Sequence, residues 1–282
     1  MPLLLVAPQL LLTLVFFYWP AAEGLWQSLT RTDAFGIHTR FVGLANFAAL
    51  FADPRYRSSV AITLVFCAAV TALSLGSGLV LALAADRELR GRDLYRVLLI
   101  WPYAVAPAIA AVLWLLLLNP QIGTIGRWLV ALGVHWDYAL NGTQALLLVI
   151  VASAWKQVSY NFLFVLAGLQ SIPRAVIEAA RMDGAKGFHR FRTIQLPLLA
   201  PTLFFLVIVD LVYAAFDTFG VIQAMTQGGP GRATETLVFK VYQDGVVNLD
   251  LGSSAAQSVV LMGGVILLTA LQFRFLGRRV AS

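Results

Sequence analysis

The sequence predicts an all-α integral membrane protein with six transmembrane helices. Of its 282 residues, 60% are hydrophobic and only 12% are charged, whereas a soluble globular domain carries about 25% charged residues. The mean hydropathy is +0.81. Several stretches of roughly 20 mostly apolar residues are long enough to cross a bilayer as helices. These observations exclude an ordinary cytosolic enzyme, a disordered protein and a coiled coil.

The predicted spans are separated by more polar segments. They cover residues 3–24, 59–85, 97–118, 144–169, 198–223 and 255–276. The third contains Pro102 and Pro107, and we expect these prolines to kink or break it because proline removes a helix hydrogen bond. The fifth is expected to begin beside Pro197 and Pro201, since proline suits the first turn of a helix.

The first predicted span begins almost at Met1, with no basic residue before it. A cleaved signal peptide is the alternative interpretation. Such a peptide needs a positively charged n-region and an apolar core of about 7–15 residues, and this run is longer and lacks that charge. We therefore expect a first transmembrane helix here.

The distribution of basic residues predicts that both termini are cytoplasmic. Twelve of the 20 Lys and Arg residues fall in three short segments, 86–96, 170–198 and the tail after residue 273. Only seven fall in the alternate segments, which are longer in total. Because cytoplasmic loops carry the excess of Lys and Arg, we interpret the net charge of +6 as a signal of orientation and expect no binding of nucleic acid.

The sequence contains no motif for catalysis, for a nucleotide or for a metal. No Gly-x-x-x-x-Gly-Lys-Ser/Thr string occurs, so no P-loop is expected. The three histidines are isolated, and Cys67 lies in an apolar run where it suits packing. We therefore expect a protein that is not an enzyme and that holds no metal or cofactor of its own.

The segment between the fourth and fifth predicted spans has the pattern of two short helices joined by a turn. Ser171 is a suitable cap for the first helix, with Pro173 in its first turn. Apolar residues recur at helical spacing in both halves, at Ile172, Val176, Ala179 and Met182 and then at Phe188, Phe191 and Ile194. Between them, Asp183-Gly184 is a turn signal. An amphipathic segment of this kind fits a groove on a partner protein or, alternatively, the surface of the lipid.

The same segment resembles the EAA motif of the permease subunits of binding-protein-dependent ABC importers. The positions that carry the resemblance are Glu178, Ala179, Ala180, Asp183, Gly184, Ala185, Phe191, Ile194, Leu196 and Pro197, followed by Pro201. In that family the motif forms a coupling segment, here residues 171–201, that docks on a separate ATPase subunit. The resemblance implies that Glu178 contacts the ATPase and that Gly184 provides the turn.

The resemblance also implies a fold and a division of the chain. The fold is that of a type I ABC importer permease. Its transmembrane core of five helices would occupy residues 57–276, after a first transmembrane helix and exterior loop in 1–56. A cytoplasmic tail would follow in 277–282.

Shorter strings narrow the resemblance to carbohydrate-uptake permeases, and among these to the permeases of sn-glycerol-3-phosphate importers. They include residues 101–107, 155–157, 159–162 and 253–260. The implied function is translocation of sn-glycerol-3-phosphate, or of a glycerophosphodiester, across the cytoplasmic (inner) membrane. The alternatives are a permease for another sugar in an ABC importer, or an ion-coupled secondary transporter.

The resemblance further implies the composition of a complex. This chain would be one of two different permease subunits. A homodimer of ATPase subunits would bind ATP and Mg²⁺, and an extracytoplasmic solute-binding protein would deliver the small-molecule substrate.

Charged and polar side chains inside the predicted spans are costly in a membrane and are therefore candidates for function. We select Lys156, Tyr160 and Asn161 in the fourth span, with Tyr213 and Asp217 in the fifth, as candidates for the translocation path. A phosphate-bearing substrate is anionic and needs a lysine together with neutral hydrogen-bond donors. These residue types supply that combination.

Two intramembrane aspartates do not suit an anionic substrate. Asp210 and Asp217 would repel it, so we expect them to pair with Lys156 or with the second permease. The alternative for the whole group is purely structural, with a Lys–Asp pair that joins two helices and no contact with substrate.

Two long segments are expected on the exterior side, at 31–57 and 226–248. Both are too long for simple turns, and we interpret them as a surface for the binding protein or as an outer gate. The alternative is a pair of solvated connectors.

Overall fold

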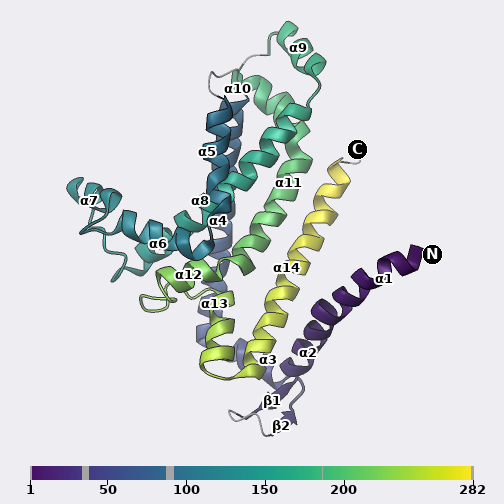
Figure 1. The fold of residues 1–282 in the computed structure, drawn as a ribbon, viewed down its shortest axis with the longest axis vertical. Helices are drawn as coiled ribbons and strands as arrows, with labels where there is room; N and C mark the ends of the chain where they lie inside the picture. The colour runs from purple at the N-terminus through teal and green to yellow at the C-terminus, as the bar shows by residue number, and fades with distance from the viewer. Residues whose placement is uncertain (1, 34–37, 87–91, 186, 281–282) are drawn as a thin grey trace. The chain divides into compact units, whose positions relative to one another are not determined.

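The computed structural model describes residues 2–33, 38–86, 92–185 and 187–280, which are almost entirely helical (Figure 1). The predicted all-α class is confirmed, apart from one short antiparallel hairpin of β1 (Thr30–Thr32) and β2 (Thr39–Phe41). Three residues that entered the prediction of orientation, Arg87, Arg90 and Lys186, lie outside the described residues.

The helices follow one another along the chain with short connections. The α-helices are α1 (Pro2–Thr13), α2 (Trp19–Ser28), α3 (Ala45–Ala52), α4 (Pro54–Ala85), α5 (Arg92–Ala104), α6 (Pro107–Leu118), α7 (Thr124–Ala131), α8 (Gly142–Ser171), α9 (Arg174–Met182), α10 (Gly187–Arg190), α11 (Leu196–Val212), α12 (Phe219–Met225), α13 (Leu237–Tyr242) and α14 (Leu251–Val280). Four π-helical turns adjoin them, η1 (Leu14–Tyr18), η2 (Phe191–Gln195), η3 (Tyr213–Asp217) and η4 (Gln243–Val247).

The chain divides into two compact units. Unit 1 comprises Met1–Ala61 and Thr236–Leu268, and unit 2 comprises Ile62–Glu235 and Thr269–Ser282. Unit 1 contains α1 to α3, the hairpin, α13 and η4, and unit 2 contains α5 to α12. Helices α4 and α14 contribute to both. The domain boundaries predicted at residues 56 and 276 stay predictions.

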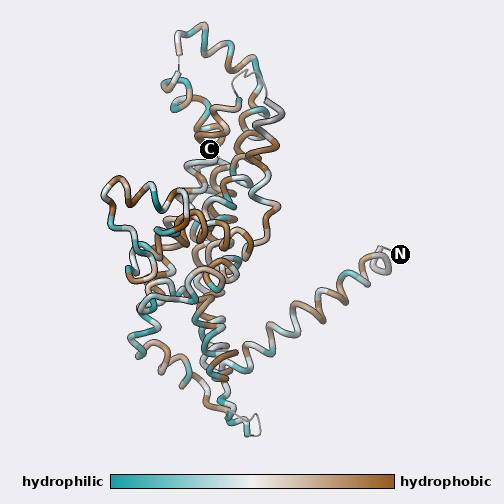
Figure 2. The backbone as a smooth tube through the Cα atoms, turned by 60° about the vertical axis from the view of Figure 1, so that its left-hand side comes forward, coloured by the Kyte–Doolittle hydropathy of each residue, from teal (hydrophilic) through white to brown (hydrophobic). Residues whose placement is uncertain are grey.

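Four described helical segments are long and apolar enough to cross a membrane, namely Pro54–Ala85, Gly142–Ser171, Gly187–Asp217 and Leu251–Arg274. They correspond to the second, fourth, fifth and sixth predicted spans, and Figure 2 shows brown, hydrophobic backbone along much of their length. The third predicted span is broken, because α5 and α6 meet at an angle of 111°. The predicted break is therefore confirmed, and it lies at Pro107, where α6 begins, whereas Pro102 lies inside α5.

The first predicted span is helical but is not among these candidates. Residues 3–24 fall within one run of α1, η1 and α2. By length and composition, the described residues supply four spans, or five if the bent pair is counted as one. The number of six therefore stays a prediction.

The start of the fifth span differs from the prediction. The helical run begins at Gly187, before Pro197 is reached, and it continues through η2 and α11 to Asp217. The π-helical turn η2 precedes Pro197, and the Leu196 N–H closes this turn by donating to the Phe191 carbonyl. Pro197 has no N–H, and it follows directly after this turn, in the first turn of α11. The second short helix predicted after Gly184 is thus the first part of this long run.

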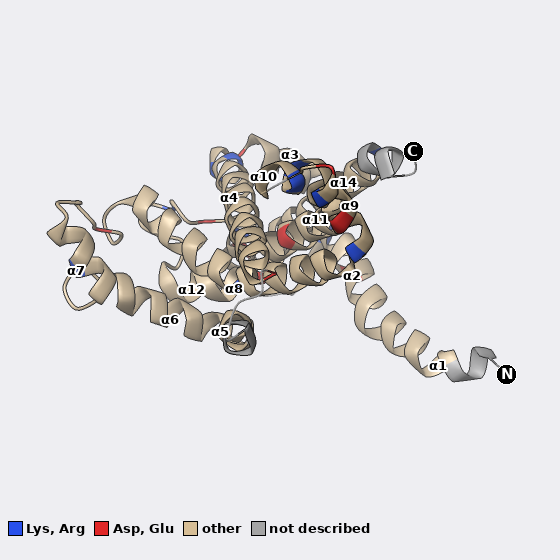
Figure 3. Ribbon diagram, turned by 90° about the horizontal axis from the view of Figure 1, so that it is seen from above, with Lys and Arg blue, Asp and Glu red and all other residues tan. Residues whose placement is uncertain are grey.

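Helix α8 is the centre of unit 2. Its apolar window is 61% buried, against 33% for α4 and 28% for the Gly187–Asp217 run. Asn141 caps its first turn, since the Asn141 side chain accepts hydrogen bonds from the backbone N–H groups of Thr143 and Gln144 at 3.0 and 3.2 Å. In Figure 3 the ribbons of α6, α8 and α12 are tan over most of their length, because Lys156 is the single charged residue in these three helices.

The core of unit 2 forms where α8 packs against α4 and α11. It consists of Ala82, Phe162, Val165, Leu166, Leu169, Ile172, Leu199 and Leu206. Helix α4 comes close to α8 at Gly78, where a Cβ atom would lie only 2.6 Å from the Cβ of Asn161. A glycine is therefore required at this position for the two helices to keep their separation.

We predict that Gly78→Ala weakens the contact between α4 and α8. The added methyl group would overlap Asn161, and overpacking of this kind costs about 1–3 kcal/mol. The matched control is Gly76→Ala in the same helix, because a Cβ at Gly76 would meet no atom within 4 Å. Thermal unfolding in detergent should give a lower midpoint for Gly78→Ala alone. Equal midpoints for the two variants would contradict this packing.

Candidate functional site

A cavity of about 650 Å³ lies in unit 2, beside the break between α5 and α6. This volume is within the usual range for sites that take small molecules. Its lining residues are Tyr103, Pro107, Lys156, Gln157, Tyr160, Ile208, Val209, Val212, Tyr213 and Asp217. They come from α5, α6, α8, α11 and η3, so helices distant in sequence form a single wall.

Four of the five residues selected for the translocation path line this cavity. Lys156 and Tyr160 lie one turn apart on α8, and Tyr213 and Asp217 both belong to η3. The Tyr213 hydroxyl donates to the Ser153 carbonyl at 3.3 Å, which ties η3 to α8. The fifth, Asn161, is fully buried behind the wall. The role of these residues in transport stays a prediction.

Aromatic rings form a second part of the wall. The ring centroids of Tyr103 and Tyr160 are 6.0 Å apart, and those of Tyr160 and Phe164 are 4.6 Å apart. The apolar ring faces therefore pack together while the tyrosine hydroxyls supply polar groups that can donate or accept a hydrogen bond.

The ammonium group of Lys156 is bound to the backbone where α5 ends. Its Nζ donates to the carbonyl of Val105. Val105 and Ala106 lie between the two helices, and Pro107 has no N–H to offer. Lys156 thus satisfies a carbonyl that the break leaves without a helical partner, and it places its charge at the cavity.

The carboxylate of Asp210 on α11 is fully buried and accepts three hydrogen bonds from neutral donors. Gln157 Nε2 donates to Oδ1 at 2.9 Å, and Ser74 Oγ and Asn161 Nδ2 donate to Oδ2 at 2.9 and 2.8 Å. The donors come from α4 and α8. This carboxylate, with its three donors, is called the Asp210 joint below, because it connects three helices.

The predicted ion pair between Lys156 and an intramembrane aspartate is wrong. Among the described residues no salt bridge joins Lys156 to Asp210 or Asp217. Lys156 and Gln157 are consecutive on α8 and point in different directions, so Gln157 reaches Asp210 while Lys156 reaches Val105. Neither Gln157 nor Ser74 was selected from the sequence, because a neutral polar side chain in an apolar run gives no indication of its partner.

The segment that resembles the EAA motif forms α9, a turn and the start of the Gly187–Asp217 run. Gly184 has a φ of +81°. Its N–H donates to the Arg181 carbonyl at 3.1 Å, and the N–H of Ala185 donates to the Ala180 carbonyl at 2.9 Å. This is a Schellman motif, which ends a helix with a left-handed glycine. The predicted turn at Asp183-Gly184 is confirmed.

Around this turn, Ala180 and Ala185 are buried and several larger apolar side chains are exposed. Ala180 and Ala185 are 4% and 9% exposed. Met182 and Phe188 are 89% and 74% exposed, and Val176 in α9 is 40% exposed. Glu178, Ala179, Asp183 and Pro197 are exposed as well, whereas Phe191, Ile194 and Leu196 are half-buried. The segment thus presents exposed apolar side chains, although the ring centroid of Phe188 lies 6.1 Å from that of Phe191.

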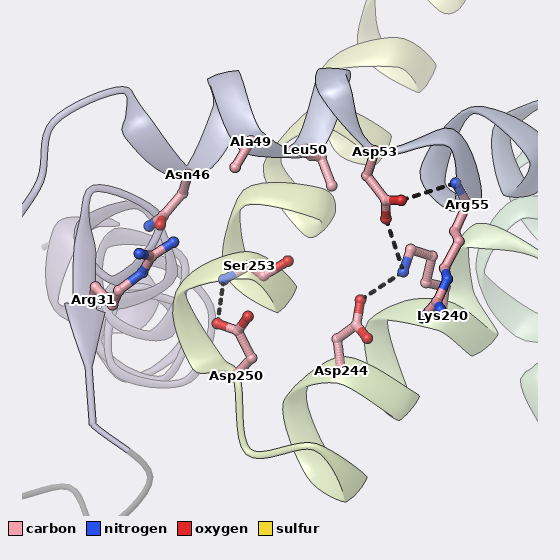
Figure 4. A pocket seen from close by; sticks show the side chains of 10 residues that line it. All are labelled: Arg31, Asn46, Ala49, Leu50, Asp53, Arg55, Lys240, Asp244, Asp250 and Ser253. Carbon is pink, nitrogen blue, oxygen red and sulfur yellow. Dashed lines mark hydrogen bonds and ion pairs between the residues drawn. The ribbon is translucent and has the colours of Figure 1, made fainter.

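Unit 1 contains a smaller pocket of about 250 Å³ with charged walls (Figure 4). Its lining residues are Arg31, Asn46, Ala49, Leu50, Asp53, Arg55, Lys240, Asp244, Asp250 and Ser253. The ammonium of Lys240 lies between two carboxylates, 2.9 Å from Asp244 and 3.9 Å from Asp53. The segment predicted as an exterior loop at 226–248 is therefore folded in its second half, as α13 and η4.

The hydrogen bonds in this pocket change the acidity of Asp244. Burial alone would raise the pKa of its carboxyl group. Hydrogen bonds from Lys240, Gln257 and Asn248, together with the charge of Lys240, outweigh burial and lower the pKa below its ordinary value. Among the described residues, no group of three or more His, Cys, Asp or Glu side chains is placed to hold a metal ion.

The sequence matches the profile of the family described as "Binding-protein-dependent transport system inner membrane component" over residues 42–282. The chain is 59% identical over 280 residues to the sn-glycerol-3-phosphate transport system permease protein UgpA of Rhizobium meliloti, covering 99% of this chain and 96% of the relative. It is 55% identical over 280 residues to the protein of the same name from Yersinia enterocolitica, covering 99% of this chain and 95% of the relative.

Solved structures share the fold. A chain of a bacterial ABC transporter involved in the import of the acidic polysaccharide alginate superposes with a TM-score of 0.84 at 19% identity, covering 99% of this chain and 95% of that one. A chain of an amino acid ABC transporter gives a TM-score of 0.52 at 17% identity, covering 83% of this chain and 94% of that one. The predicted ABC importer permease fold is confirmed.

We predict that acid weakens the structure around Asp244. Because its pKa is lower in the folded protein than in the unfolded one, the carboxylate stabilises the fold above the ordinary carboxyl pKa of about 4, and this stabilisation is lost as the pH falls through the folded value. The protection of the α13 and η4 amides against hydrogen exchange, expressed relative to the intrinsic exchange rate at the same pH, should therefore fall in acid. Asp244→Asn should exchange faster already at neutral pH and lose this acid dependence, whereas the control Asp250→Asn in the same pocket should keep it. An unchanged profile for Asp244→Asn would refute the assignment.

Proposed function

Since the chain belongs to the binding-protein-dependent transport system inner membrane component family, we propose that it is a permease subunit of an ABC importer for sn-glycerol-3-phosphate or a glycerophosphodiester. The observation that supports this choice of substrate is the sequence identity of 54–59%, over nearly the whole chain, to permeases named for sn-glycerol-3-phosphate transport. The alternative, another sugar as substrate, has no specific observation in its favour. The chain is a transport subunit of the inner membrane and not an enzyme.

The chemistry of the cavity supports an anionic, hydroxylated substrate. The Lys156 ammonium and the hydroxyl of Tyr160 are suited to phosphate oxygens, because charge-assisted hydrogen bonds to phosphate are strong. Asp217 is suited to the opposite end of the molecule, where its carboxylate accepts hydrogen bonds from hydroxyl groups. Asn161 contributes indirectly, through Asp210.

The complex that we propose has four kinds of subunit. A second, different permease would complete the passage, and an extracytoplasmic solute-binding protein would deliver the substrate. A homodimer of ATPase subunits would bind ATP and Mg²⁺, so this chain needs no nucleotide or metal of its own. Both termini of the chain would be cytoplasmic, on the side of the ATPase.

The exposed segment around Gly184 supports a docking role. Val176, Met182 and Phe188 are exposed apolar side chains in the same segment as the exposed Glu178, and exposed apolar side chains of this kind favour insertion into a groove on a partner. We assign the partner as the ATPase. The long helical run that starts at Gly187 would then carry movement of the ATPase to α11.

Reconstitution tests this function directly. We expect vesicles that contain both permeases, the ATPase and the binding protein to hydrolyse ATP faster, and to accumulate label, when sn-glycerol-3-phosphate is added. Glycerol and a neutral sugar serve as controls and should do neither. Uptake by this chain alone under an ion gradient would instead indicate a secondary transporter, and stimulation by the sugar alone would indicate another importer.

We predict that Gly184→Val uncouples transport. A β-branched residue at a φ of +81° is strained by about 1–3 kcal/mol, and no neighbouring atom adds to this strain, because nothing lies within 4 Å of a Cβ there. Uptake should fall by about tenfold or more while the amount of permease in the membrane is unchanged. Gly184→Asn is the matched control, since asparagine tolerates this conformation. Normal uptake by the valine variant would contradict the coupling role.

A further inference from the structure

We infer that Asp210 is a positioning residue for Gln157, and that it holds the Gln157 carbonyl oxygen toward the cavity as the acceptor for a substrate hydroxyl. The inference rests on the proposed function, because it concerns which part of a hydroxylated phosphate ester the cavity recognises. It concerns two residues that were not among the candidates for the translocation path.

The orientation of the Gln157 amide follows from the chemistry of its neighbour. An ionised carboxylate can only accept hydrogen bonds. The Gln157 side chain therefore turns its NH₂ group to Asp210, and Nε2 donates to Oδ1 at 2.9 Å. The amide oxygen must then point away from Asp210.

The amide oxygen of Gln157 is free to bind a ligand. Gln157 itself lines the cavity, although the residue is only 5% exposed. Among the described residues, the Asn161 oxygen is enclosed and has no hydrogen-bond partner. The Gln157 oxygen does not belong to this enclosed, unpartnered group. The two amides bound to Asp210 thus differ, because one oxygen is sealed in the packed core and the other faces the cavity.

The surroundings keep Asp210 in place. Ser74 and Asn161 both donate to its second oxygen, and the close approach of α4 to α8 at Gly78 brings these two donors together. With Oδ2 held by two donors, Oδ1 is left for Gln157. The carboxylate has little freedom to turn, so the amide of Gln157 is held in one of its two possible orientations.

The result is a cavity with an uneven distribution of donors and acceptors. Lys156 supplies a positive donor, whereas the Gln157 oxygen and Asp217 supply acceptors. A polyol phosphate matches both kinds of group, because its phosphate accepts and its hydroxyls donate. An analogue without the hydroxyl would leave a buried acceptor unpaired, and sites of this kind reject such analogues strongly.

Asp210→Asn tests the inference with little change in shape. The substituted amide can donate to Gln157, so the Gln157 side chain is able to turn over and to present its NH₂ group to the cavity. Gln157→Leu removes the acceptor entirely and serves as a second variant. Ser74→Ala is the matched control, because Asn161 still donates to Oδ2 and holds the carboxylate while the bond from Gln157 to Oδ1 is kept.

The measurement is the ratio of two uptake rates in the reconstituted complex, for sn-glycerol-3-phosphate and for 3-hydroxypropyl phosphate, which lacks the central hydroxyl. The same binding protein serves every variant, so its own preference cancels when ratios are compared. We expect Asp210→Asn and Gln157→Leu each to lower the ratio about tenfold, the effect of one lost hydrogen bond. Ser74→Ala should leave the ratio unchanged.

A double variant that exchanges the donor and the acceptor distinguishes this role from a merely structural one, because a structural role would not restore the uptake ratio. The double variant with Asp210→Asn and Gln157→Glu exchanges donor and acceptor and again leaves an oxygen toward the cavity, so it should recover the ratio. The inference would be overturned if Asp210→Asn or Gln157→Leu slowed the uptake of both substrates equally, or kept the wild-type ratio. A wild-type complex that carries neither substrate would instead contradict the proposed function, so the two failures are distinguishable.

Discussion

A carboxylate buried among membrane-spanning helices has to find its hydrogen-bond partners within the protein, and the arrangement of unit 2 depends on how Asp210 meets this constraint. In hydrocarbon no water is available, and an unsatisfied polar group costs several kcal/mol. Asp210 takes its three donors from α4 and α8. It therefore fixes the relative rotation of three helices more strictly than apolar contacts alone, which tolerate slippage.

The same joint connects packing, coupling and the cavity. Its donors can converge because Gly78 lets α4 approach Asn161, and its third donor, Gln157, belongs to the cavity wall. Asp210 itself lies on the helical run that begins at Gly187, directly after the exposed turn at Gly184. At 1.5 Å per residue, about 35 Å of helix separates that turn from the joint. One element thus links the docking surface to the wall that would face the substrate.

The sequence was most informative where the cause of a structure is local. Pro107 ends a helix because proline lacks an N–H, and Gly184 ends α9 because it adopts a positive φ, so both were predictable from the residues. The partner of Lys156 was not, because it depends on which way α8 is rotated against the broken segment. Periodicity places residues on a face of their own helix but does not say which group lies opposite. The predicted Lys–Asp pair was wrong for that reason. The predicted start of the fifth span was wrong because the helical run continues through η2 into Pro197.

The central claim is that the cavity between the α5–α6 break, α8 and η3 is the passage for an anionic, hydroxylated substrate. An electron cryomicroscopy structure of the assembled importer, trapped with a non-hydrolysable ATP analogue and sn-glycerol-3-phosphate, tests it most directly. We predict density for the phosphate beside Lys156 and for a hydroxyl within hydrogen-bond distance of the Gln157 oxygen. Density for the substrate in a passage that these residues do not line would contradict the claim.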